Sequence, residues 1–352
     1  MIWLTWRQFR ASAAVTAVAL AALAAVLAIT RPGIADRHSA AVAACGRSSD
    51  CERIVEDFFY DHQLGWFALI AVVLLLPALV GLFWGAPLIA GELESGTHRL
   101  VWNQSVTRVR WLAVKLVVTG AATVTVAGLA SLVATWWSEP LDKAAVEHFT
   151  RMSPLLFDTR GIAPIGYAAF AFVLGVTVGL LVRRTVPAMA VTLAVFAVVQ
   201  IAMPMLVRPH LMSPVRMNTP ITVDNMAGLQ AKGPDAPLKV TVKAPDPDAW
   251  VLSNETLNAS GRTVGTLPAH LTNGACRPPA ERPPANPSEV TGRPGPPQGC
   301  FDAIKKLGYR QRVTYQPSTR YWAFQGIETG IYAVLTVGLV GFCVWWIRRR
   351  IS

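Results

Sequence analysis

Charged residues whose spacing suggests chemistry lie in one polar stretch between two apolar segments, 64–84 and 111–137. Glu92 and Glu94 form a carboxylate pair at the start of this stretch, and Lys115 enters the apolar segment that follows it. Ionised carboxylates make strong, charge-assisted hydrogen bonds with basic groups. The pattern therefore favours recognition of basic groups on a partner molecule.

The sequence lacks the short motifs that mark common catalytic and nucleotide-binding sites. It contains no Gly-x-x-x-x-Gly-Lys-Ser/Thr run, so the chain is not expected to bind ATP phosphates by itself. It also contains no His-Glu-x-x-His, no Gly-x-Ser-x-Gly and no metal-spaced Cys/His set. We therefore expect no enzyme activity, no catalytic residue, no metal and no cofactor, and a membrane enzyme is the least favoured interpretation.

Carboxylates also occur in two other places. The stretch after the first apolar segment contains a group of acidic residues beside a histidine: Asp50, Glu52, Glu56, Asp57, Asp61 and His62. Their spacing matches no known metal-binding loop, so solvated charge is the favoured interpretation. Glu328 lies near the outer end of the last apolar segment, where an ionisable residue is a functional candidate. A solvated helix flank fits its position equally well.

Composition indicates a membrane protein. Of the 352 residues, 53% are hydrophobic and only 15% are charged, whereas soluble domains usually carry about 25% charged residues. The net charge of +11, from 32 basic and 21 acidic residues, could suit nucleic acid. No recognition motif is present, however, and the basic residues flank the apolar segments. We therefore expect no nucleic-acid partner.

Six apolar segments are each long enough to cross a bilayer, which needs about 20 apolar residues. They cover 11–30, 64–84, 111–137, 161–182, 186–207 and 324–347. The first is longer than the core of a signal peptide, and no small-x-small cleavage site precedes Arg31, so we interpret it as an uncleaved span. The predicted fold class is an all-α polytopic membrane protein with six transmembrane helices.

The amino-terminal part of the chain is expected to hold five of these helices. Residues 1–10 place aromatic and basic side chains at helical spacing, which predicts an interfacial helix, although an ordinary aromatic flank fits nearly as well. Residues 11–207 then contain the first five transmembrane helices. Polar loops are expected at 33–63 and 138–160.

The largest polar region, 208–323, is expected to be a smaller extracytoplasmic insertion, either α+β or irregular. Residues 278–297 are dense in proline, which predicts an extended or loose segment. Apolar and polar residues alternate over 238–243, which predicts a strand. Residues 324–352 form the sixth transmembrane helix and a basic cytosolic tail.

Four of the five cysteines lie in polar segments, and Cys343 lies in an apolar one. Four cysteines permit three pairings. We expect the local one, Cys45 with Cys51 and Cys276 with Cys300, with free thiols as the alternative. Disulfides persist in oxidising compartments, so both segments are expected to face the outside.

Basic residues predict the orientation in the membrane. An even number of spans leaves both termini on one side, and the short segments on that side are rich in Lys and Arg, as cytoplasmic loops are. These residues are Arg7, Arg10, Arg99, Arg108, Arg110, Lys115, Arg183, Arg184 and Arg348 to Arg350. We therefore expect a multi-pass protein with both termini in the cytosol, which places the cysteine pairs outside.

Gly-x-x-x-Gly runs, whose spacing lets helices approach closely, occur in three of the spans. In a chain this rich in alanine and glycine, each run alone is a weak signal. The runs are Gly81/Gly85, Gly175/Gly179 and Gly326/Gly330.

The polar stretch between the second and third spans resembles the coupling segment of permease subunits in the type-2 ATP-binding-cassette (ABC) exporter family. That segment carries an acid, a Gly-Thr pair, a leucine, a Pro/Ser-Val-Ser/Thr-Arg turn and a lysine that enters the third span. The matching positions are Glu94, Gly96-Thr97, Leu100, Ser105-Val106-Thr107-Arg108 and Lys115. The family often has proline where Ser105 stands here. The runs 3–9 and 321–328 also look typical of the alanine-rich actinobacterial members.

This resemblance implies that a separate cytosolic ATPase binds residues 85–115. The residues assigned to coupling are Glu92, Glu94, Gly96, Thr97, Leu100, Arg108 and Lys115. Gly96 permits a turn that other residues resist, and the hydroxyl of Thr97 is suited to capping the helix that follows. A plain solvated loop is the alternative.

The resemblance also implies an activity: export of an amphipathic or lipidic compound from a bacterium, across the plasma membrane, by alternating access. Its expected partners are the ATPase, a second permease copy in a homodimer or heterodimer, and membrane lipid. The alternative is a polytopic sensor or assembly protein whose region 208–322 binds an outer partner without transport.

Overall fold

The computed structural model describes residues 2–46, 51–97, 107–145, 149–230, 237–268, 271, 275–276 and 297–350. It divides into two compact units. The helical unit comprises Met1–Leu211 and Thr319–Ser352, and the insertion unit comprises Met212–Ser318. Leu100, the proline-dense segment 278–296 and the last two residues of the basic tail lie outside the described residues.

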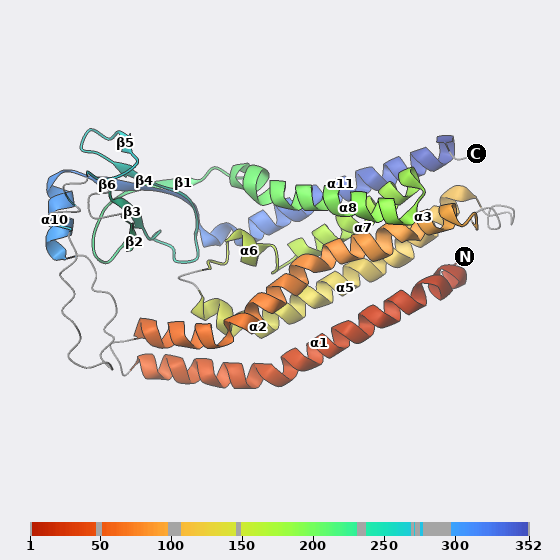
Figure 1. The fold of residues 1–352 in the computed structure, drawn as a ribbon, viewed down its shortest axis with the longest axis horizontal. Coiled ribbons are helices and arrows are strands. Elements are labelled where there is room, and N and C mark those ends of the chain that lie inside the picture. The colour runs from red at the N-terminus through yellow and green to blue at the C-terminus, as the bar shows by residue number, and fades with distance from the viewer. Residues whose placement is uncertain are drawn as a thin grey trace. The chain divides into compact units, whose positions relative to one another are not determined.

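Long α-helices form the helical unit (Figure 1). Their bounds are α1 Ile2–Cys45, α2 Cys51–Val80, α3 Ala86–Glu94, α5 Arg108–Ala144, α6 Pro154–Phe157, α7 Ala163–Val182, α8 Thr185–Ala202 and α11 Tyr321–Arg350. Shorter elements join them: the π-helices η1 Gly81–Gly85 and η2 Met203–Val207, and the 3-10 helices η3 Arg208–His210 and η4 Ser318–Arg320.

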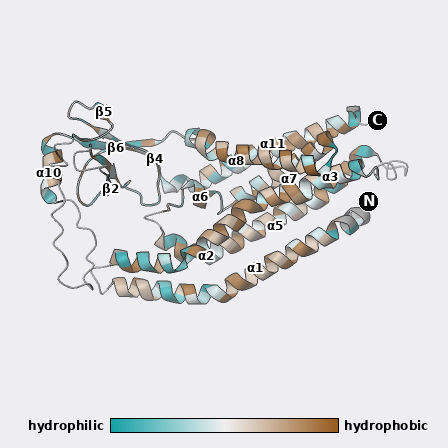
Figure 2. Ribbon diagram, in the orientation of Figure 1, coloured by the Kyte–Doolittle hydropathy of each residue, from teal (hydrophilic) through white to brown (hydrophobic). Residues whose placement is uncertain are grey.

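The helices confirm the predicted fold class. Within the described residues, six helical stretches are long and apolar enough to span a membrane: Phe9–Cys45, Arg53–Glu94, Arg108–Ala144, Ala163–Val182, Thr185–His210 and Ser318–Arg349. Figure 2 shows hydrophobic residues along the middle of these helices and hydrophilic residues gathered at several of their ends.

The predicted polar loop at 33–63 is wrong, because most of it is helical. The helix α1 continues to Cys45, α2 begins at Cys51, and a disulfide joins these two cysteines (S–S 2.13 Å). Alanine, glutamate and arginine, which favour helix, occur throughout this segment, so both helices extend beyond their apolar parts. The helix that starts at Ile2 also includes residues 2–10, predicted as an interfacial helix, and the first apolar segment without interruption. Likewise α5 extends to Ala144, into the expected loop at 138–160.

The helix α7 lies at the centre of the helical unit. It packs against α2, α3, α5, α8 and α11. Within its apolar stretch of 18 residues, 78% is buried inside the protein. Its sequence is apolar on every side, as expected of a helix surrounded by other helices. In contrast, only 6% of the corresponding 18-residue apolar stretch of α1 is buried, although α1 packs along α5 and α2. Most of the α1 surface is therefore left for lipid or another apolar partner.

The insertion unit contains a four-stranded antiparallel sheet in the order β1-β6-β4-β5 and a separate pair, β2-β3. The strands are β1 Val215–Pro220, β2 Met226–Gln230, β3 Lys239–Val242, β4 Trp250–Leu257, β5 Thr263–Val264 and β6 Arg310–Gln316. Strand β3 confirms the strand predicted at 238–243. The helix α10, Gln298–Lys306, buries Cys300, Phe301 and Ile304 against the apolar residues of the pair. The second expected disulfide, Cys276–Cys300, is also present.

Candidate functional site

The segment that resembles a coupling element begins as a continuation of the second span. The π-helix η1 connects α2 directly to α3, and Pro87 stands in the first turn of α3, where proline is well tolerated. The helix α3, both termini and the short turn between α7 and α8 lie at the same end of the helical unit (Figure 1). We call this the coupling end, and the end that carries Cys45–Cys51 the opposite end.

Four glycines bring η1 and α3 into backbone contact with α7. A Cβ atom added to Gly85 would lie 2.4 Å from the carbonyl oxygen of Phe172, and one added to Gly175 would lie 2.4 Å from that of Gly81. A Cβ on Gly179 would lie 2.5 Å from the carbonyl oxygen of Ala86. Two of the Gly-x-x-x-Gly runs therefore pack against each other, whereas a Cβ on either glycine of the third run would meet nothing within 4 Å.

Glu92 ties α3 to α5. Its Oε1 lies 2.6 Å from Nζ of Lys115, and the Lys115 side chain is only 4% exposed. Lys115 Nζ also donates a hydrogen bond to the carbonyl oxygen of Leu88 (3.2 Å) and lies 5.1 Å from the centre of the Trp111 ring. Inside an apolar bundle such a pair persists because each charge compensates the other. The contact therefore fixes the position of α3 on α5.

Glu94 ties the end of α3 to the start of α8. Its Oε2 accepts hydrogen bonds from the backbone N–H of Thr185 (2.9 Å) and from the Thr185 hydroxyl (2.7 Å). A carboxylate at a helix amino terminus is stabilised by the unpaired N–H groups and by the helix dipole. Sequence analysis assigns Glu92 and Glu94 to a partner protein, whereas both have partners within this chain. Glu94 stays exposed and therefore accessible to a partner as well.

The remaining predicted coupling residues border the segment 98–106, which lies outside the described residues. Gly96 has a φ of 73°, the left-handed conformation that glycine adopts readily. The hydroxyl oxygen of Thr97 lies 3.0 Å from that of Ser95. Arg108 is the first residue of α5, whose amino terminus is capped by the hydroxyl of Thr107 (3.3 Å from Arg110 N).

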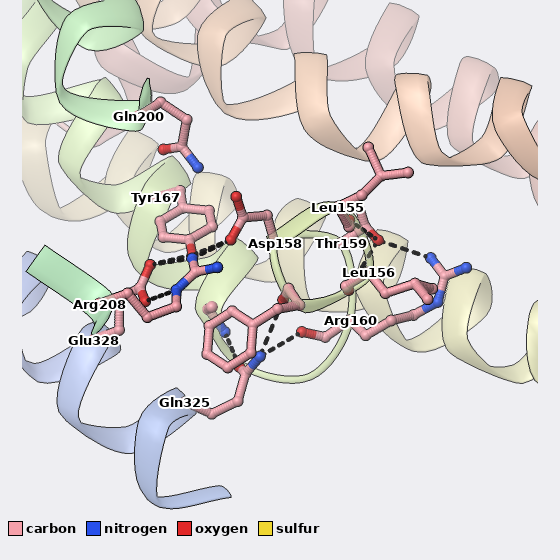
Figure 3. Close-up of polar contacts among 12 residues, drawn as sticks. Leu155, Leu156, Asp158, Thr159, Arg160, Tyr167, Gln200, Arg208, Gln325 and Glu328 are labelled. Carbon is pink, nitrogen blue, oxygen red and sulfur yellow. Dashed lines mark hydrogen bonds and ion pairs between the residues drawn. The ribbon is translucent and has the colours of Figure 1, made fainter. Parts of the chain in front are cut away.

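A second polar site lies at the opposite end and is fully enclosed (Figure 3). Arg208 of η3 donates from Nε to Glu328 Oε2 (2.8 Å) and from Nη2 to Glu328 Oε1 (2.9 Å), and Nη2 also contacts Asp158. The hydroxyl of Tyr167 lies 2.6 Å from Glu328 Oε1 and 3.1 Å from Asp158 Oδ1. The guanidinium stacks on the Phe157 ring at 4.1 Å. We call Asp158, Tyr167, Arg208 and Glu328 the buried ionic cluster.

Gln325 positions the backbone that presents Asp158. Its Oε1 accepts hydrogen bonds from the N–H groups of Ile162 (3.0 Å) and Ala163 (2.8 Å). Its Nε2 donates to the carbonyl oxygens of Phe157 (3.0 Å) and Arg160 (3.1 Å). A buried loop is tolerated only when its backbone groups are paired in this way. The segment 154–162 is therefore a fixed part of the helical unit.

Sequence analysis missed most of this cluster. Arg208 follows the fifth apolar segment and was expected to begin the outer polar region, and Asp158 was placed in a polar loop. Only Glu328 was a candidate, with a solvated flank as the alternative, and that alternative is wrong because its side chain is 0% exposed. An arginine and a glutamate at the outer ends of two spans were the only available signal. Their pairing depends on which helices are neighbours.

Together, the six spans, the buried charges at both ends and the linked helix α3 define a polytopic membrane protein. The profile of the ABC-2 membrane transporter related family matches residues 17–208. Because this match covers more than half of the chain, the protein belongs to that family. No curated protein and no solved structure shows significant similarity to it.

Membership supports a permease role in a multi-pass membrane protein. Permeases of this family are generally non-catalytic and generally work with a partner ATPase. The matched residues include the whole of α3 and the predicted coupling residues. They end at Arg208, so they contain every member of the buried ionic cluster except Glu328.

Proposed function

We propose that this protein is the permease subunit of an ABC exporter in a bacterial plasma membrane. A separate cytosolic ATPase docks on residues 92–115, and ATP-driven closure of that ATPase moves the helices in an alternating-access cycle. Both termini lie in the cytosol, and a second permease copy completes the transporter. Actinobacterial permeases are the subgroup that the sequence resembles.

The connections of α3 carry this proposal. Glu92 joins α3 to α5 through Lys115, Glu94 joins it to α8 through Thr185, and glycine contacts join it to α7. A displacement of α3 is therefore transmitted to three membrane-spanning helices at once, because each contact is a short polar pair or a backbone contact. A plain solvated loop has no need of these connections.

The surface of the helical unit supports an apolar cargo. A groove of about 700 Å³ lies between α1 and α2, with Val126 of α5 at its edge. Its lining is apolar and includes Val15, Leu20, Leu76 and Phe83. Ligand sites of this volume are common in proteins, and the apolar lining of this groove suits an apolar ligand. An amphipathic or lipidic compound therefore fits the proposal better than a polar solute.

Docking is tested by co-expression of the full chain with the candidate ATPase. Glu94→Arg reverses the charge that caps α8, and Gly96→Pro is incompatible with the φ of 73°. We expect both variants to lose ATPase co-purification and ATP hydrolysis by the reconstituted complex. Glu139→Arg is the matched control, because Glu139 is an exposed carboxylate near the opposite end, and it is expected to retain both.

Transmission of movement from α3 to α8 is tested separately with Thr185→Val. This variant removes the hydroxyl donor to Glu94 but leaves the backbone donor. Glu94→Gln and the double variant complete a mutant cycle on the rate of ATP hydrolysis. Non-additive effects are expected, because the two side chains are in contact. Wild-type co-purification and hydrolysis in Glu94→Arg and Gly96→Pro would refute the coupling assignment.

A further inference from the structure

The buried ionic cluster joins four separate elements at the opposite end. Asp158 follows α6, Tyr167 belongs to α7, Arg208 forms part of η3 at the end of α8, and Glu328 belongs to α11 (Figure 3). The side chains of Arg208 and Glu328 are 0% exposed, and that of Asp158 is 8% exposed. The coupling role proposed for the other end does not involve this cluster.

The cluster contains one more acid than base. Arg208 is the guanidinium that faces both Asp158 and Glu328. The other nearby arginine, Arg160, is paired with Asp142, whose Oδ2 lies 3.0 Å from its Nε. If both carboxyl groups of the cluster were ionised, an uncompensated negative charge would be buried. Burial of such a charge is so unfavourable that a carboxyl group usually takes up a proton instead.

The hydrogen atoms of the cluster support the same conclusion. Arg208 uses Nε–H for Glu328 Oε2 and the two Nη2 hydrogens for Glu328 Oε1 and Asp158 Oδ1. Tyr167 has one hydroxyl hydrogen, which serves the 2.6 Å contact with Glu328. The 3.1 Å contact between Tyr167 Oη and Asp158 Oδ1 then lacks a hydrogen, unless Asp158 carries one. Proton uptake at Asp158 supplies it.

The hydrogen bonds point to Asp158 as the proton acceptor. Both oxygens of Glu328 already receive hydrogen bonds, two from the Arg208 guanidinium and one from the Tyr167 hydroxyl. Burial is the largest cause that raises the pKa of Asp158; with Arg208 lowering it and the Glu328 carboxylate also raising it, the pKa is about 6. Among the described residues, Arg208 Nη1 is buried without a hydrogen-bond partner. The cluster is thus not a fully satisfied structural ion pair.

We propose that the buried ionic cluster is a proton-binding site, with Asp158 as the acceptor, which holds the ends of α7, α8 and α11 together while the proton is bound. The groups that face Asp158 are Tyr167 from α7, Arg208 from η3 and Glu328 from α11. Tyr332 of α11 lies within the range of the Asp158 charge. Tyr332 packs on Tyr167 with ring centres 4.8 Å apart. Loss of the proton leaves two carboxylates on one guanidinium, and repulsion between them weakens the junction.

The proton makes the junction more stable at acidic pH. A folded-state pKa raised above the unfolded value means that the folded protein binds more protons between the two values. The stabilisation is therefore complete below about pH 4 and is lost as the pH rises through about 6, the pKa of Asp158. Acidic pH at the opposite end therefore stabilises the junction between the ends of α7, α8 and α11.

Infrared difference spectroscopy tests the proton directly, on the full-length protein in lipid nanodiscs. We expect a carboxylic C=O band that loses half of its intensity near pH 6, the pKa of Asp158. The band should shift in D2O and on labelling with carbon-13 aspartate, but not with carbon-13 glutamate. A band that is absent, or that follows the glutamate label, overturns the proposal.

Three variants extend the test. Asp158→Asn should remove the band and flatten the fall of Tm with rising pH, because its amide supplies the missing hydrogen at every pH. Glu328→Gln should move the titration to lower pH, because that carboxylate raises the pKa of Asp158. The control, Asp61→Asn at an exposed aspartate of α2, should change neither. If Asp158→Asn does not fold, the isotope labels and Glu328→Gln still decide: an unmoved titration in Glu328→Gln refutes the site.

Discussion

At the scale of single residues, two buried cations of the helical unit each contact a carboxylate. Lys115 meets Glu92 at the coupling end, and Arg208 meets Glu328 at the other. The gain from a buried pair is small compared with well-packed apolar residues, but the loss of one partner is strongly destabilising. Such pairs therefore contribute fixed connections between helices more than net stability.

The Glu92–Lys115 pair gives a prediction at this scale. Lys115→Met removes the ammonium group that lies 2.6 Å from the Glu92 carboxylate, which is 13% exposed. We expect the free energy of unfolding to fall by about 3 kcal/mol. The double variant Glu92→Gln/Lys115→Met should recover most of that loss, because it buries no charge. Denaturant unfolding of the purified protein in detergent measures both values.

The matched control is Lys143→Met on the same helix. Lys143 is 64% exposed and pairs with Glu139 four residues away. Because water screens such a pair, its replacement should change the free energy of unfolding by less than about 0.5 kcal/mol. Equal effects at Lys115 and Lys143 would contradict a special role for the buried pair.

At the scale of elements, η1 determines how the second span approaches α7. Backbone atoms of Gly81 and Gly85 lie against α7 where Gly175 stands, and α3 continues beyond them along the same helix. Wider turns of the π type often occur at functional positions of helices. Here the wider turn precedes the helix that carries Glu92 and Glu94, so the glycine contact and the residues proposed for coupling belong to one continuous structure.

Substitution of these glycines tests the close approach. Gly85→Ala and Gly175→Ala each place a methyl group 2.4 Å from a backbone carbonyl oxygen, so α7 and η1 must separate. We expect a loss of about 1–3 kcal/mol in stability, measured as a lower Tm. Gly330→Ala is the control, since its Cβ would meet nothing within 4 Å. It should keep or raise the Tm, because alanine favours helix over glycine.

At the scale of the whole molecule, the orientation in the membrane follows from charges and cysteines rather than from any one contact. Basic residues stand at the coupling end, for example Arg183 and Arg184 in the exposed turn before α8. The disulfide Cys45–Cys51 joins α1 and α2 at the opposite end. Cytosolic segments are rich in Lys and Arg, and disulfides form outside the cytosol, so both features predict one orientation.

Labelling of introduced cysteines tests this orientation in whole cells. Ser95→Cys places an exposed thiol at the coupling end, and Ser260→Cys places one in the insertion unit. A membrane-impermeant maleimide should label Ser260→Cys in intact cells, and Ser95→Cys only after the cells are opened. The wild-type protein is the control, because Cys343 is its free cysteine and is buried. Labelling of Ser95→Cys in intact cells would contradict the proposed orientation and ATPase docking.

The sequence by itself determined the number of spans and the fold class, and it predicted the local cysteine pairs and the strand at 238–243. Each of these depends on properties of short segments: apolar length, local cysteine spacing, or alternation of side chains. The sequence also suggested where a coupling segment lies, but it did not predict that Glu92 and Glu94 contact Lys115 and Thr185. Those partners lie on other helices, and helix neighbours are not encoded in the spacing within one segment.

Only the tertiary structure decided which charges are buried together. Arg208 is 50 residues from Asp158 and 120 residues from Glu328, and each looks like an ordinary polar flank of its own segment. They meet because α7 packs against both α8 and α11 and because Gln325 holds the loop that carries Asp158. The physical reason is that burial depends on what surrounds a residue in space, whereas sequence pattern reports only its neighbours along the chain.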